Sequence, residues 1–183
     1  MWGTVLKRDL LGETREEDKF HNKEELKEYL KSEIEKQGEN VVIRNLDVSL
    51  IEDLSDLFYE YRNIRTLDLS GWKTSNVENM KDMFFSSHFN GDISQWDVSR
   101  VVDMGFMFYS SDFNGDISDW NVSRVVDMDM MFEKSKFSGD LSKWDVSNIL
   151  WWSRTFYESP LEGKEPEWYK RLGGPRGFSI DLK

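Results

Sequence analysis

A motif that returns every 24 residues dominates the chain and limits the folds open to it. Consecutive copies begin at Phe89, Phe113 and Phe137, reading FNGDISQWDVSRVVDMGFMFYSSD, FNGDISDWNVSRVVDMDMMFEKSK and FSGDLSKWDVSN. Residues 67–88 fit the same frame, and residues 47–58 form a more degenerate copy. A fixed period of this length is typical of repeat proteins, in which each unit buries its apolar side chains against its neighbours.

The spacing of apolar residues inside a copy predicts a strand followed by a helix. The alternation in Gly-Asp-Ile-Ser at 91–94 is that of a short strand. Val101, Met104, Met107 and Phe108 recur as on one face of a short helix. One copy alone buries too little apolar surface to offset its ordering entropy, so copies must stack. We therefore predict an α/β repeat solenoid, LRR-like, whose stacked 24-residue coils each hold a short parallel strand and a short helix.

Sequences on both sides of the repeats predict covers for the ends of the stack. Asn22 followed by Glu25 is a helix-start signal, Leu26 and Leu30 lie on one apolar stripe, and Gly38 stands where a helix would end. The predicted organisation is an N-terminal segment with a capping helix at 1–40, about five coils at 41–160, and a C-terminal cap or tail at 161–183.

Charge and composition exclude several classes of function. The formal net charge is −11 and the isoelectric point about 4.7, which disfavours direct binding of nucleic acid or anionic lipid because phosphates require Lys and Arg. Cysteine is absent, so disulfides, thiolate nucleophiles and Cys-ligated metals are excluded. The first twenty residues contain no apolar run, so we expect no membrane span and a cytoplasmic protein, or a surface or secreted one if a signal peptide was removed.

The motif GDISxWDVSxVxxMxxMF, repeated in register, resembles the BspA-like leucine-rich-repeat surface-protein family of bacteria and phages. The resemblance covers about residues 41–160, and the segment KEELKEYLKSEIEKQGEN is similar to the leader that precedes such repeats. It implies a parallel-strand, leucine-rich-repeat-like solenoid and a role in adhesion or protein binding. It supplies no catalytic residue and no cofactor.

Residues that recur identically in each copy are interpreted as structural. An aromatic row could stack on sugars and a Met row could form an adaptable groove, but fixed spacing inside each coil favours core packing for both. A carboxylate row could bind cations, but Ca²⁺ needs six to eight converging oxygens, so we interpret this acidic face as solvated turns without a metal. The rows are Trp72, Trp96, Trp120 and Trp144; Met80, Met104 and Met128; Met83, Met107 and Met131; and Asp68, Asp92, Asp116 and Asp140.

No pattern of catalytic residues stands out. His21 and His88 are far apart in sequence, and neither has a neighbouring serine or carboxylate that identifies a catalytic dyad. Paired carboxylates are expected by chance in so acidic a chain. We therefore predict no catalytic residues, no cofactor and no enzymatic activity.

Positions at which polar residues of one copy become apolar in the next are the candidate binding site. Glu78 and Asp82 of the first clear copy are replaced by apolar residues in the next two copies. If the predicted helices form, these residues gather on one exposed flank with a charged rim, as at a protein interface. The alternatives are that Trp168 and Tyr169 of the C-terminal segment cover the flank, or that a rotated helix buries it. The predicted partner-binding residues are Val102, Phe106, Val126, Met130, Leu150, Arg100 and Arg124.

The composition and this flank favour a non-enzymatic module that binds a protein partner, or a second copy of the chain, through one face of the stack. The alternative is an acidic inhibitor or immunity protein that mimics nucleic acid and occupies the basic channel of a nucleic-acid enzyme. Steep salt dependence would distinguish the mimic from the apolar interface.

Overall fold

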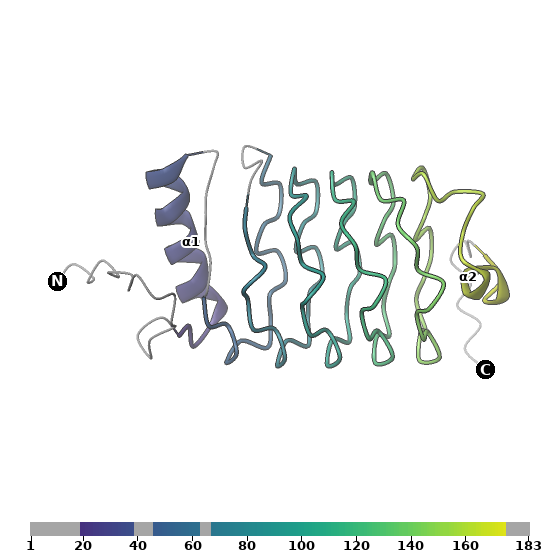
Figure 1. Cartoon of the computed structure of the whole chain (residues 1–183), viewed down its shortest axis with the longest axis horizontal. Helices are drawn as coiled ribbons and strands as arrows, with labels where there is room; N and C mark the ends of the chain where they lie inside the picture. The colour runs from purple at the N-terminus through teal and green to yellow at the C-terminus, as the bar shows by residue number, and fades with distance from the viewer. Residues whose placement is uncertain (1–18, 39–45, 63–66, 175–183) are drawn as a thin grey trace.

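The repeats form a single stack of coils that is closed by a helix at each end. A computed structural model describes residues 19–38, 46–62 and 67–174. Helix α1 (Lys23–Gln37) lies at one end, the short helix α2 (Glu167–Arg171) lies at the other, and the coils stand side by side between them (Figure 1). The order of coils along the stack is their order in sequence.

Helix α1 begins and ends at the residues that its sequence predicts. The side chain of Asn22 accepts a hydrogen bond from the Glu25 amide (2.9 Å), and the Glu25 carboxylate accepts one from the His21 amide (3.0 Å). Gly38 follows the last turn with φ 71°, a conformation that suits glycine. Leu26 and Leu30 are buried. The predicted N-terminal helix is therefore confirmed.

Equivalent side chains of successive coils form columns through the interior. Phe84, Phe108, Phe132 and Phe156 stack with ring centroids 5.6–5.8 Å apart and nearly parallel planes. The indoles of Trp96, Trp120 and Trp144 each donate to a carbonyl 27 residues earlier, as Trp120 does to Ile93 (3.2 Å). The tryptophan and methionine rows are at most 5% exposed. They are therefore core, which excludes a sugar platform or a methionine groove built from them.

The prediction of an α/β repeat solenoid is wrong in its secondary structure. Among the described residues the coils contain only isolated parallel bridges, such as Asn79 with Asp103 and Asp103 with Asp127, and no extended strand. The only helices in this part of the chain are the two end helices. The predicted strand at 91–94 contains a turn in which the Asp92 carboxylate accepts from the Ser94 amide (2.9 Å).

The predicted helix at 101–108 is a run of turns because its amides alternate between two kinds of partner. Met107 and Tyr109 donate within the coil to the carbonyls three residues before them (3.2 and 3.0 Å). Met104, Phe106 and Phe108 instead donate to the next coil, at 2.8–2.9 Å. An α-helix needs every amide for its own i−4 carbonyl, so hydrogen bonding between coils replaces it.

Residues with positive φ break the helical path at regular intervals. Phe106 and Ser110 have φ values of 57° and 52°, and the equivalent residues of the neighbouring coils share this left-handed conformation. This conformation costs non-glycine residues about 1–2 kcal/mol each. The cost is tolerated because the same turns place Met104, Met107 and Phe108 inside the stack, where each is fully buried.

Helix α2 continues the tryptophan column beyond the last coil. Trp168 follows Trp144 by one full period, and its indole donates to the Leu141 carbonyl at 2.8 Å. Tyr169 packs edge-on against Phe156, with ring centroids 4.9 Å apart. These two residues therefore cover the end of the stack.

Candidate functional site

One outward-facing row changes character along the stack. Its residues are polar in the earlier coils, Glu52 and Glu78, and apolar in the later ones. Val102 is 36% exposed and Leu150 is 61% exposed, whereas Val126 between them is half-buried. Large apolar side chains that are exposed in a line of this kind are typical of interaction surfaces.

Backbone hydrogen bonds fix the direction in which this row points. The amides of Val126 and Asp127 both donate to the Val102 carbonyl, at 2.8 and 3.3 Å. In the next coil the amides of Leu150 and Trp151 bind the Val126 carbonyl in the same way. The preceding residue, Val125, is fully buried, whereas the side chain of Val126 lines the groove on the outside of the stack.

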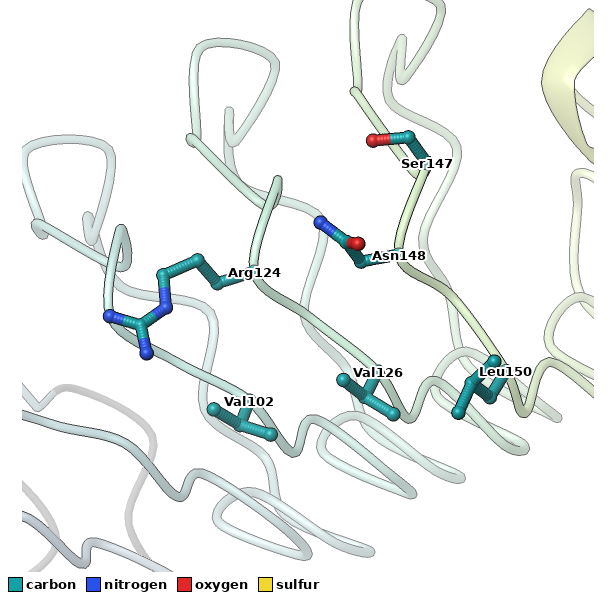
Figure 2. A pocket seen from close by; sticks show the side chains of 6 residues that line it. All are labelled: Val102, Arg124, Val126, Ser147, Asn148 and Leu150. Atoms are coloured by element: carbon teal, nitrogen blue, oxygen red, sulfur yellow. The ribbon is translucent and has the colours of Figure 1, made fainter.

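The row forms the floor of a shallow groove with a volume of about 500 Å³. Figure 2 shows the three apolar side chains side by side on successive coils, with polar side chains along one edge. The guanidinium of Arg124 extends from its own coil toward the preceding coil. The residues that line the groove are Val102, Arg124, Val126, Ser147, Asn148 and Leu150.

Two equivalent arginines of neighbouring coils differ in their partners. Arg100 donates to the Asn76 side chain at 2.8 Å and forms an ion pair with Glu78. One period later the counterparts of Asn76 and Glu78 are Arg100 and Val102, and neither of these can accept a hydrogen bond through its side chain. Arg124 has no hydrogen bond or ion pair with the described residues, and its side chain is exposed.

Two half-buried carboxylates, Asp127 and Asp129, follow Val126 in sequence. Burial raises the pKa of Asp127 to about 6, although the Asp129 amide donates to it at 2.8 Å. Burial also raises the pKa of Asp129, with Asp103 adding repulsion. Neither aspartate lines the groove, so Arg124 is the one charged residue among those that do.

Phe106 and Met130 do not line the groove. The prediction placed them beside Val102 and Val126 on one side of a helix, but the left-handed turn at each of these two residues removes that geometry. Phe106 is half-buried, and its ring lies 6.1 Å from that of Tyr109. The spacing of buried residues in the sequence could not show that Phe106 and Met130 lie outside the groove. A helix and a run of turns bury the same positions of the repeat but direct the outward residues differently.

Trp151 extends the exposed apolar surface, and sequence analysis missed it. It occupies the position held by Asp103 and Asp127 in earlier coils and is 53% exposed. Leu150 was identified because it is an apolar residue at a position that is polar in earlier copies. The same criterion also identifies Trp151. The proposed cover for this face, Trp168 and Tyr169, lies instead on the last coil against Phe156.

The predicted acidic face is a row of turns. Asp92, Asp116 and Asp140 are exposed, and each accepts a hydrogen bond from a serine amide two residues later, at 2.9–3.0 Å. These bonds lower the pKa of all three carboxyls. Asp68 is half-buried and accepts in the same way from Ser70. No group of three or more potential metal ligands is found among the residues that the structure describes.

His88 does have a carboxylate partner, contrary to the sequence-based expectation. Its Nδ1 lies 2.7 Å from the Asp112 carboxylate, whose other oxygen binds Lys136 at 2.7 Å. Asp112 follows His88 by one repeat period, so reading across the period could have found the pair. The His88 side chain is 43% exposed, and neither His88 nor Asp112 lines the groove.

Comparisons with known proteins identify a family but no function. The model of a family described as "Mycoplasma protein of unknown function, DUF285" matches residues 24–134 and again 89–168. This family is associated with BspA-like surface repeat proteins. No curated protein and no solved structure shows significant similarity to the chain. Within the described ranges, no helix is long and apolar enough to cross a membrane.

Proposed function

Because the chain belongs to the DUF285 family, whose members have no assigned function, we propose from the groove itself that the protein is a non-enzymatic module that binds another protein. The observation that carries this proposal is the outward-facing row Val102, Val126 and Leu150, which is apolar where earlier coils carry glutamates. The same proposal includes a relationship to BspA-like surface proteins. It also includes a role in adhesion or protein binding.

The groove has the composition of a protein interface. An apolar centre with a polar edge is the usual arrangement, and aromatic and Arg residues supply most of the binding energy. Here Leu150 and Trp151 are the most exposed large apolar residues of the described chain, and Arg124 supplies the cation. None of the three is needed inside the stack, so their placement favours a role outside it.

The test compares capture of partners by the wild-type protein and by Leu150→Glu. The substitution places a charge at the most exposed residue of the apolar row and should abolish capture of the specific partner from a source-cell extract, while the folded state is kept. Leu50→Glu is the matched control, because Leu50 is also exposed (47%) but lies outside the groove residues. Equal capture by all three proteins, measured by quantitative mass spectrometry, would contradict the proposal.

A second candidate, an acidic mimic of nucleic acid, is favoured by one specific observation. Asp92, Asp116 and Asp140 are exposed in a line, and the lowered pKa of each keeps it ionised at neutral pH. Such a mimic would bind a basic protein with an affinity that falls steeply as salt rises. Loss of binding in Asp116→Asn with Asp140→Asn, but not in Leu150→Glu, would favour the mimic over the groove.

A further inference from the structure

The charge of Arg124 limits what can occupy the groove. An exposed arginine without an internal partner is available for a carboxylate, with which a guanidinium forms two parallel hydrogen bonds. A partner that covered the groove without a carboxylate would bury this cation unpaired, at considerable cost. The occupant that fits therefore presents an Asp or Glu beside its apolar side chains.

The net charge of the protein limits the number of such carboxylates. At −11 the chain repels a strongly acidic partner, and this repulsion acts over about 10 Å at 0.1 M salt. Arg124 is the one charged side chain among the residues that line the groove. A carboxylate is therefore favourable only at the edge that carries Arg124.

The spacing of the row selects the conformation of the occupant. The residues that follow the row, Asp103, Asp127 and Trp151, are joined by parallel bridges from coil to coil. Bridged backbones lie about 5 Å apart, so the row beside them repeats at about this spacing, although ring centroids in the interior phenylalanine column are 5.6–5.8 Å apart. Side chains on one face of a helix repeat about every 5.4 Å, whereas those on one face of a strand repeat about every 6.6 Å. Over the two intervals from Val102 to Leu150, the mismatch is about 1 Å for a helix and about 3 Å for a strand.

Resting on the proposed function, we propose that the groove binds a short amphipathic helix of the partner protein. The helix axis runs along the stack, and its apolar ridge packs on Val102, Val126 and Leu150. An Asp or Glu beside the ridge pairs with Arg124. Trp151, exposed next to Leu150, extends the apolar floor at one end of the helix.

The experiment selects ligands from a displayed library of random peptides long enough to form several helical turns. The library is panned against wild-type protein, Arg124→Gln, Arg100→Gln and Val126→Glu, each checked by near-UV circular dichroism for an unchanged fold. Arg100→Gln is the matched control, because Arg100 is already paired with Glu78. Wild-type protein should select apolar residues at i, i+3 or i+4, and i+7, together with one Asp or Glu.

Calorimetry on one selected peptide then measures the charge pairing. Changing its acid to the amide should weaken binding by roughly tenfold. Arg124→Gln should weaken binding by a similar factor, and the two changes together should cost no more than either alone. Arg100→Gln should leave both the selection and the affinity unchanged.

Different failures identify different errors. Selection of apolar residues at alternate positions would overturn the helix, and selection without an acid, or with the same acid in Arg124→Gln, would overturn the pairing. Concentration-dependent dimers in sedimentation that disappear in Val126→Glu would make a second copy the occupant and overturn the inference. If wild-type protein selects no peptide beyond those that Val126→Glu selects, the proposed function itself fails.

Discussion

The buried columns and the outward row follow different rules along the same stack. Phe84, Phe108 and Phe132 are identical in successive coils and fully buried, whereas the outward row changes from glutamate at Glu78 to valine at Val102. Identity in the columns follows from packing, because each ring must fit the rings above and below it. The change in the row has no such cause, since these side chains face solvent. The comparison teaches that departures from the repeat, more than the repeat itself, indicate function.

The largest expected effect belongs to a column residue. Phe132→Ala should lower the free energy of unfolding by about 3–5 kcal/mol, because it removes a fully buried ring that contacts Phe108, Phe137 and Phe156. Urea denaturation followed by tryptophan fluorescence measures this loss. Phe85→Ala, in the half-buried outer stack, is the control and should cost clearly less. Equal losses would break the distinction between buried and outward rows.

A smaller effect tests whether the tryptophan column extends onto α2. Trp168→Phe should cost about 1–2 kcal/mol, because it leaves the Leu141 carbonyl without its indole donor while keeping most of the ring volume. Hydrogen exchange should show faster opening of the last coil. Trp151→Phe, at a residue that is 53% exposed, should leave stability unchanged. An unchanged unfolding curve for Trp168→Phe would show that α2 is not part of the stack.

The carboxylate beside the groove should give a smaller, pH-dependent effect. Folded Asp127 keeps its proton up to pH about 6, whereas in the unfolded chain it ionises near pH 4. Acidification from pH 7 to 5 should therefore favour the folded state through this group. Asp127→Asn keeps the side-chain oxygen that accepts from the Asp129 amide.

We expect Asp127→Asn to raise stability at pH 7 by roughly 1 kcal/mol, allowing for solvent screening at this half-buried site, and by less at pH 5. Thermal unfolding at the two pH values measures both numbers. Asn79 already occupies the equivalent position of an earlier coil, so the substitution is compatible with the turn. A gain that is the same at both pH values would exclude titration of Asp127 as its cause.

Sequence reasoning predicted the vertical alignment of repeats but not the structure within a coil. A fixed period places Trp96, Trp120 and Trp144 in one column regardless of local conformation, and the hydrogen bonds of their indoles confirm it. The inward spacing of Val101, Met104 and Met107 suits both a helix and a run of turns. The choice depends on amides such as that of Phe106, whose acceptor is in another coil, and no local pattern reveals such a partner.

The repeat period also predicted part of the candidate site. Val102, Val126, Leu150 and Arg124 occupy equivalent or neighbouring positions of the repeat, so the period alone brings them together. Phe106 was assigned through helical geometry that does not exist in the coil. The difference between Arg100 and Arg124 was also not anticipated, although Glu78 and Val102 precede them by the same number of residues.

The substitution Val102→Glu tests the central claim most directly, because it gives Arg124 the partner that Arg100 has in Glu78. We predict a free energy of unfolding within about 0.5 kcal/mol of wild type, since an exposed ion pair contributes little, together with loss of binding to helices selected on the wild-type groove. A loss of stability of several kcal/mol would show that Val102 serves packing. Unchanged stability with unchanged binding would show that this face is not where the protein binds.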